Sequence, residues 1–108
     1  MTNETMKISK TIYSLKNREL SNLLIGRKGG RTTILIIDKL LLKPYNANEL
    51  SKILNLDYKT IVHHMNIIHN HQYVEKEELE NCILYYPSKK LFNSLEEYKL
   101  IKKFLKIE

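Results

Sequence analysis

Apolar residues recur along this chain every three or four positions, the spacing that gives an α-helix one buried side. Five segments show this spacing, at about residues 8–25, 31–43, 46–55, 58–71 and 88–107. Two shorter runs, at residues 73–76 and 82–86, instead resemble β-strands. The pattern therefore predicts a mostly α fold with a small β-hairpin, in the order α-α-α-α-β-β-α.

Capping signals mark the starts of two of these helices. Asn46 is followed three residues later by Glu49, which predicts a capping box. Asp57 predicts the next start, with its side chain accepting from the free amide near Thr60. Asn55 tolerates left-handed backbone and is a candidate C-cap between the two helices. The sequence therefore predicts two short helices joined by a tight turn.

The second helix of this pair, over residues 58–71, has two distinct sides. Ile61, Met65 and Ile68 are spaced to form its buried side. At 100° per residue, the opposite side carries the polar residues Lys59, His63 and Asn66. This polar side is the first candidate for binding a partner.

The run after this helix predicts a hairpin wing. The polar stretch 77–81 joins the two strand-like runs, and Pro87 ends the second run. Two helices with a tight turn, followed by a hairpin, form a winged helix-turn-helix. We expect a single domain over residues 1–108, with a helix-turn-helix core at about 31–72, a wing at about 73–87 and terminal helices at about 8–25 and 88–107. Ser94 and Glu97 predict a capping box within the last segment.

The segment from about residue 23 to residue 87 resembles the sequences of a known family. The motifs that carry the likeness are Gly29-Gly30-Arg31, Pro44-Tyr45-Asn46, Asn48-Glu49-Leu50, the segment 56–65 and Tyr85-Tyr86-Pro87. Together they resemble archaeal winged helix-turn-helix regulators of the ArsR-like superfamily, whose recognition helix corresponds to the segment 56–65. The resemblance implies a transcriptional regulator that binds double-stranded DNA, usually as a homodimer.

The charge of the chain favours a polyanionic partner. The net charge is +6, and residues 1–60 hold eleven basic against five acidic residues, whereas residues 61–108 hold seven of each. A basic half of this kind is typical of nucleic-acid binding, although it also serves solubility alone.

Two groups of residues are candidates for DNA contact. An α-helix fits the major groove, and its N-terminal side chains reach base edges. The first group therefore lies on the helix over 58–71, namely Tyr58, Lys59, Thr60, His63 and Asn66. The second group, Arg27, Lys28 and Arg31, lies beside the start of a helix and forms a candidate phosphate clamp. The alternative for either group is an ordinary solvated surface.

The wing favours a different interpretation. Residues 75–80 hold four acidic residues and one basic residue. Acidic groups are repelled by phosphates, so wing contact with the DNA backbone is not expected from charge. The alternative function is a winged-helix module that docks a partner protein and does not read DNA.

The terminal helices carry more apolar residues than a small core needs. Leu91, Phe92, Leu95 and Phe104 belong to this surplus. We expect a homodimer through these helices, since an unpaired stripe would leave an exposed patch. The alternative is that the two terminal helices pack on each other within one chain.

Catalytic, metal, cofactor and membrane functions have no support in the sequence. No phosphate-loop, nucleophile-elbow or zinc-protease motif occurs. The four histidines, His63, His64, His69 and His71, contain no pair at the i, i+4 spacing of a helical zinc site. Cys82 is the only cysteine, which excludes a disulfide framework and suggests a buried apolar role. We expect a cytoplasmic protein without enzymatic activity or cofactor, and no effector can be inferred.

Overall fold

The computed structural model describes residues 18–107, which form two compact units. The larger unit spans Arg31–Phe92, and the smaller one combines residues up to Gly30 with those from Asn93 onward. Of the first predicted helix, only the part from residue 18 onward falls within the described residues. The interpretation of the chain as one domain stays a prediction.

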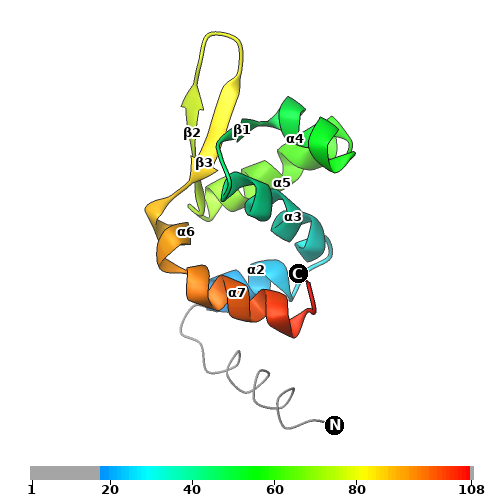
Figure 1. The fold of residues 1–108 in the computed structure, drawn as a ribbon, viewed down its shortest axis with the longest axis vertical. Coiled ribbons are helices and arrows are strands. Elements are labelled where there is room, and N and C mark those ends of the chain that lie inside the picture. Colours follow the sequence, from blue (N-terminus) through cyan, green and yellow to red (C-terminus); the bar gives the residue numbers. More distant parts are fainter. Residues whose placement is uncertain (1–17, 108) are drawn as a thin grey trace, which may run out of the picture. The chain divides into compact units, whose positions relative to one another are not determined.

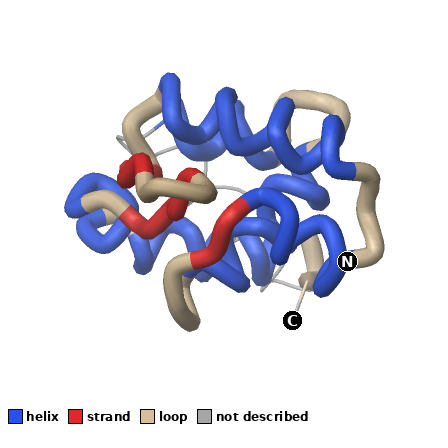
Figure 2. Tube along the Cα trace, turned by 90° about the horizontal axis from the view of Figure 1, so that it is seen from above, coloured by secondary structure: helices blue, strands red, loops and turns tan. Residues whose placement is uncertain are grey.

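The larger unit is built from helices and a short sheet (Figures 1 and 2). Its elements are α3 (Gly30–Leu40), β1 (Tyr45–Asn46), α4 (Ala47–Leu54), α5 (Tyr58–Asn70), β2 (Val74–Glu78), β3 (Ile83–Pro87) and α6 (Lys89–Asn93). The hairpin of β2 and β3 extends beyond α4 and α5 (Figure 1). The predicted fold class, mostly α with a hairpin wing, is confirmed.

The tight turn between α4 and α5 follows from local side-chain chemistry. The capping box at the start of α4 is confirmed, because the amide of Glu49 donates to Asn46 Oδ1 at 2.8 Å and the amide of Asn46 donates to Glu49 Oε1 at 2.9 Å. Asn55 ends α4 with a φ of 54°, in the left-handed region, as predicted. Ser51 Oγ then donates to the carbonyl of Leu56 at 2.5 Å and ties the turn to α4.

The predicted N-cap of α5 is present, with one correction. Asp57 accepts a hydrogen bond at 3.1 Å from the amide of Lys59, and not from the amide near Thr60. Either donor satisfies an N-cap, because the amides of both the second and the third helical residue are free.

The sheet has one strand that the sequence pattern does not reveal. β1 pairs antiparallel with β3, with Tyr45 opposite Tyr85, so the order is β1-β3-β2. A two-residue strand is too short to show an alternating pattern, which explains why it was not predicted. The hairpin strands lie one or two residues later than predicted, because Glu77 and Glu78 pair with Leu84 and Ile83 although acidic residues are uncommon in strands.

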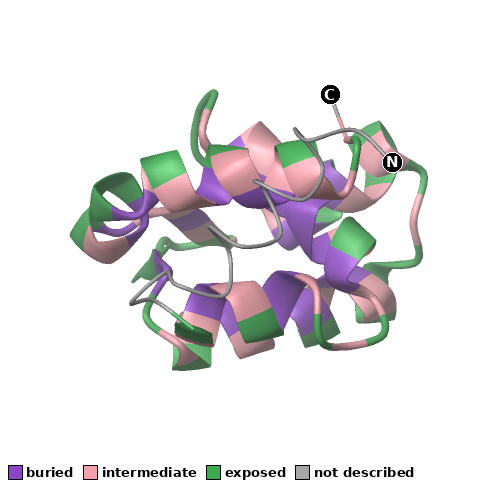
Figure 3. Ribbon diagram, turned by 90° about the horizontal axis from the view of Figure 1, so that it is seen from below, coloured by how far each residue is buried: buried purple, intermediate pink, exposed green. Residues whose placement is uncertain are grey.

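The buried side of α5 forms part of the core of the larger unit. Ile61, Met65 and Ile68 are fully buried, as the periodicity predicts. The polar residue His64 is also buried on this helix. Its Nδ1 lies 3.0 Å from the hydroxyl of Thr33 on α3. This hydrogen bond between α3 and α5 partly offsets the cost of burying both groups. Buried and exposed positions alternate around the helices in this way (Figure 3).

The smaller unit contains α2 (Arg18–Leu24) and α7 (Leu95–Phe104). Both helices bury apolar residues, among them Leu20, Tyr98 and Ile101. Gly30 is required at the end of the loop that follows α2, because a Cβ atom there would collide with the backbone carbonyl of Leu24. Its neighbour Gly29 has a φ of 89°, which also favours glycine.

Three helix predictions need correction. α3 ends at Leu40, so Lys39 occupies its last turn in place of Lys43, and Leu42 is 74% exposed. The last predicted helix is two helices that meet at Ser94. The predicted capping box there is absent, because the Ser94 side chain makes no capping hydrogen bond and its backbone has a ψ of 8° where an N-cap usually has extended backbone.

Within residues 18–107 we find no helix with the length and hydropathy needed to cross a membrane.

Candidate nucleic-acid interface

The outer face of α5 is polar and open to solvent. Lys59, His63 and Asn66 are exposed, on the side opposite to the buried residues of the helix. The helix has 13 residues, which gives a length of about 20 Å. The three side chains therefore lie where the periodicity places them, and their role in binding stays a prediction.

The other two candidate residues on α5 lie at its first turn. Tyr58 is 52% exposed, whereas Thr60 is half-buried. No acidic residue occurs in this first turn, and the Asp57 carboxylate is engaged by the amide of Lys59. The start of α5 therefore offers an exposed aromatic hydroxyl and an ammonium group next to each other in the sequence.

A groove of about 440 Å³ separates α5 from the wing. From α5 it is lined by Tyr58, Val62 and Asn66, which are spaced four residues apart. Its remaining walls come from the start of α4 and from the wing, namely Asn46, Ala47, Asn48, Lys76, Asn81, Cys82, Ile83 and Tyr85. Asn66 is thus shared between the outer face of α5 and this groove, which we call the α5–wing groove.

Lys76 and Asn48 are functional candidates that the sequence analysis missed. The pairing of β1 with β3 joins the start of α4 to the wing, and a two-residue strand gives no sequence signal for this. Lys76 was counted as the single base among the acids of the wing, but nothing in the sequence was a reason to assign it a role. Cys82, which we expected to be buried, is partly exposed at the edge of the same groove.

The acidic residues of the wing divide between its two faces. Because successive side chains of a strand point to opposite faces, Glu75 and Glu77 lie on the face away from Lys76, whereas Glu78 shares its face. All three glutamates are exposed. The groove side of β2 therefore carries one base and one acid, although the wing as a whole is acidic.

Two tyrosines, Tyr58 and Tyr85, line the α5–wing groove. Burial raises the pKa of Tyr85 above its usual value of 10.0, and the neighbouring Tyr58 raises that pKa further. The phenol of Tyr85 is therefore neutral at physiological pH. A neutral phenol is able both to donate and to accept a hydrogen bond.

The predicted phosphate clamp is divided between the two units. Arg27 is half-buried and Lys28 is exposed in the loop after α2, whereas Arg31 is exposed in the first turn of α3, which belongs to the larger unit. The amide of Gly30 donates to the carbonyl of Arg27 at 3.4 Å and closes the loop. The clamp formed by these three residues stays a prediction.

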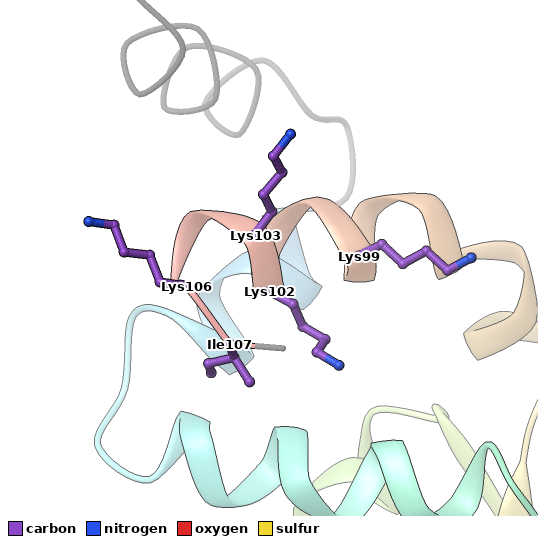
Figure 4. Close-up of a pocket in the computed structure, with 5 residues that line it drawn as sticks. All are labelled: Lys99, Lys102, Lys103, Lys106 and Ile107. Atoms are coloured by element: carbon purple, nitrogen blue, oxygen red, sulfur yellow. The ribbon is translucent and has the colours of Figure 1, made fainter. Parts of the chain in front are cut away.

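A second basic region lies at the end of α7. Lys99, Lys102, Lys103, Lys106 and Ile107 line a hollow of about 430 Å³. The four lysine side chains point in different directions (Figure 4), and Lys102 Nζ lies 5.7 Å from the centroid of the Tyr98 ring. This arrangement does not form a binding site for a single anion.

Among residues 18–107 no group of three or more metal-ligating side chains occurs.

Comparison with known proteins identifies the fold. No protein-family model and no curated protein sequence matches the chain. The transcriptional regulator YodB from B. subtilis, in its reduced form, matches with a TM-score of 0.66 at 16% identity, over 83% of this chain and 89% of that chain. The chain has the winged helix-turn-helix fold. The agreement covers most of both chains.

Two further solved structures support this assignment. A MarR protein from Peptoclostridium difficile matches with a TM-score of 0.58 at 25% identity, over 93% of this chain and 63% of that chain. An ArsR-family transcriptional regulator matches with a TM-score of 0.50 at 11% identity, over 97% of this chain and 93% of that chain. All three matches agree with the winged helix-turn-helix fold, so the fold expected from the sequence is confirmed.

Proposed function

We propose that this protein is a sequence-specific DNA-binding transcriptional regulator that inserts α5 into the major groove. The observation that carries the proposal is the exposed polar face of α5, which stands opposite a fully buried apolar side and follows a capped helix-turn-helix turn. Similarity to known regulators and the net charge of +6 support it.

In this proposal the outer face of α5 reads base edges. Asn66 is suited to a bidentate pair of hydrogen bonds with adenine, and Lys59 to guanine or a phosphate. His63 lies between them on the same face, and its ring is able to hydrogen-bond a base edge. Tyr58 and Thr60 contact the DNA at the first turn of the helix.

The α5–wing groove holds the adjacent backbone of the duplex. Asn48 at the start of α4 and Lys76 on β2 supply an amide and an ammonium group, both exposed, on two of its walls. Amides and ammonium groups are common donors to phosphate oxygens. Arg27, Lys28 and Arg31 contribute further phosphate contacts.

A homodimer through the terminal helices is the oligomeric state we propose. Of the predicted apolar surplus, Leu91 is fully buried, but Phe92 is 53% exposed and Leu95 and Phe104 are partly exposed. These three leave apolar surface for a second copy. Two-fold symmetry would place two copies of α5 about 34 Å apart, in successive turns of the major groove. Assignment to the ArsR-like branch of winged-helix regulators belongs to the same proposal.

A selection of duplex sequences at physiological salt tests the proposed function. The full-length protein is incubated with random duplexes, bound molecules are sequenced, and the mass of the free protein is measured in solution. We expect a near-palindromic motif to be enriched and the mass of the free protein to be that of a dimer. Recovery of unselected sequences, with the same affinity as the starting pool, would refute sequence-specific binding.

The acidic wing supports a second candidate function, a protein-interaction module. Glu75, Glu77 and Glu78 are all exposed, and Leu79 is 46% exposed at the tip of the hairpin. This candidate predicts that the protein binds DNA weakly and without sequence preference, while a stoichiometric partner co-purifies. Charge reversal of the wing would then abolish the co-purification.

A further inference from the structure

The carboxyl end of α5 is held by two side chains at the start of α6, Ser88 directly before the helix and Lys90 in its first turn. After α5 the chain reverses at Gln72, which has a φ of 67°. The carbonyls of His71 and Gln72 lie directly after Asn70, the last residue of α5. Lys90 Nζ donates to the carbonyl of His71 at 2.7 Å, and Ser88 Oγ donates to the carbonyl of Gln72 at 2.6 Å.

Lys90 contacts the same segment in a second way. Its ammonium group lies 4.5 Å from the centroid of the Tyr73 ring, and Tyr73 is fully buried. A cation above an aromatic ring is attracted by the ring, more strongly where water is excluded. A cation at the carboxyl end of a helix also complements the helix dipole. Lys90 thus caps α5 from another helix.

Ser88, directly before α6, also fixes the base of the wing. The amide of Ser88 donates to the carbonyl of Tyr73 at 3.0 Å, next to the pair of Val74 with Pro87 where β2 starts and β3 ends. Ser88 Oγ in turn accepts from the amide of Leu91 at 3.2 Å, which caps α6. We call Ser88, Lys90 and their three carbonyl partners the α6 clamp. It joins the end of α5, the start of β2 and the end of β3 at one point.

We propose that Lys90 is a positioning residue that fixes the angle between α5 and the wing, and thereby the sequence selectivity of DNA binding. The inference rests on the proposed function, since it concerns how α5 reads a duplex. Lys90 is half-buried at the far end of α5 from Tyr58 and Lys59, and it lies on neither the outer face of α5 nor the α5–wing groove. Its effect on DNA is therefore indirect, through the orientation of the helix.

Three variants separate positioning from charge. Lys90→Met keeps the length of the side chain but removes the hydrogen bond and the contact of the cation with the ring. Lys90→Arg preserves both, because a guanidinium also donates to carbonyls and stacks on aromatic rings. Lys89→Met is the matched control, since the neighbouring Lys89 is exposed and its loss changes the net charge by the same amount.

The dissociation constants of the three variants are measured for a selected duplex and for a scrambled duplex of equal length. We expect Lys90→Met to weaken binding to the selected duplex roughly tenfold and to change binding to the scrambled duplex no more than Lys89→Met does. Lys90→Arg should stay within about twofold of the wild type on both. Urea unfolding checks that each variant is folded at the assay temperature. If Lys90 contributed to stability alone, the ratio of the dissociation constants for the selected and the scrambled duplex would stay unchanged.

Other outcomes overturn the inference. Equal ratios for Lys90→Met and the wild type would show that Lys90 does not position α5. Equal losses for Lys90→Met and Lys89→Met would assign the effect to net charge. If the wild type binds all duplexes equally well, the proposed function fails. Hydrogen exchange of the His71 amide then tests the α6 clamp by itself, because this amide donates to the carbonyl of Ile67 at the end of α5. Faster exchange in Lys90→Met only would support the clamp, and unchanged exchange would refute it.

Discussion

The helix α5 and the β2–β3 hairpin border the same groove, yet they are held in place by different forces. α5 buries Ile61, Met65 and Ile68 completely, whereas β2 buries only Val74 and is exposed from Glu75 onward. Tyr85 on β3 is buried as well, so it is β2 that is held mainly by backbone pairing to β3 and by the α6 clamp. A surface fixed by a packed core is suited to reading base edges, because its side chains are held in one place before binding.

The two elements also differ in charge. The outer face of α5 carries Lys59 and no acidic residue, whereas the wing exposes four glutamates and one lysine. The alternation of faces along β2 places Lys76, and not Glu75 or Glu77, toward the α5–wing groove. An acidic wing is therefore compatible with DNA binding, provided that only one of its faces approaches the phosphates.

The largest expected effect tests the anchoring of α5 against that of the wing. Ile61→Ala removes a fully buried side chain, so it should lower the free energy of unfolding by about 2–5 kcal/mol. Leu79→Ala, at the half-exposed tip of the hairpin, should change it by less than about 0.5 kcal/mol. Urea unfolding followed by circular dichroism measures both. Similar losses in the two variants would contradict the difference in anchoring.

The next effect tests the two faces of the wing. Glu78→Lys places a new cation on the face of Lys76, so it should tighten binding to any duplex by about tenfold at low salt. The slope of log affinity against log salt should become steeper by about one unit. Glu77→Lys makes the same charge change on the opposite face and should have a much smaller effect. Equal gains in both variants would show that the faces are not distinguished.

A smaller effect concerns the turn that aligns α5 with the groove. Asn46→Ala removes the capping box of α4 and should cost about 1 kcal/mol of folding free energy. Asn48→Ala, two residues later, removes an exposed side chain that makes no capping bond and should leave stability unchanged while weakening DNA binding. Thermal unfolding and fluorescence anisotropy measure the two quantities. Loss of stability in Asn48→Ala would contradict this separation.

The smallest effect follows from the raised pKa of Tyr85. A phenol whose folded-state pKa lies above the unfolded value stabilises the fold fully below pH 10, and this contribution is lost as the pH rises from about 10 through the folded-state pKa. Stability should therefore fall above pH 10 in the wild type. Tyr85→Phe should reduce this dependence, which urea unfolding between pH 8 and 11 would detect.

Local signals in the sequence were sufficient for the helix-turn-helix but not for the groove. Asn46, Glu49 and Asn55 act within a few residues, so the start and end of α4 could be predicted from their types alone. The groove depends on β1 pairing with β3 across 40 residues of chain, from Tyr45 to Tyr85, and no local pattern encodes that contact.

The C-terminal region shows the same limit. Leu95, Tyr98 and Ile101 share one helical stripe, and this stripe is present in α7. Residues 88–107 were predicted as one helix, because their apolar residues keep helical spacing across Ser94. The role of Lys90 was equally hidden, since the carbonyl of His71 lies 19 residues earlier in the chain.

The central claim, that the outer face of α5 reads the sequence of a duplex, is tested most directly with His63→Ala combined with Asn66→Ala. Neither substitution removes a lysine or arginine, and both side chains are exposed, so the fold and the general attraction to phosphates should persist. The account predicts that the dissociation constant for the selected duplex rises about 100-fold while that for a scrambled duplex is unchanged. Wild-type affinity of the double variant for the selected duplex would contradict it.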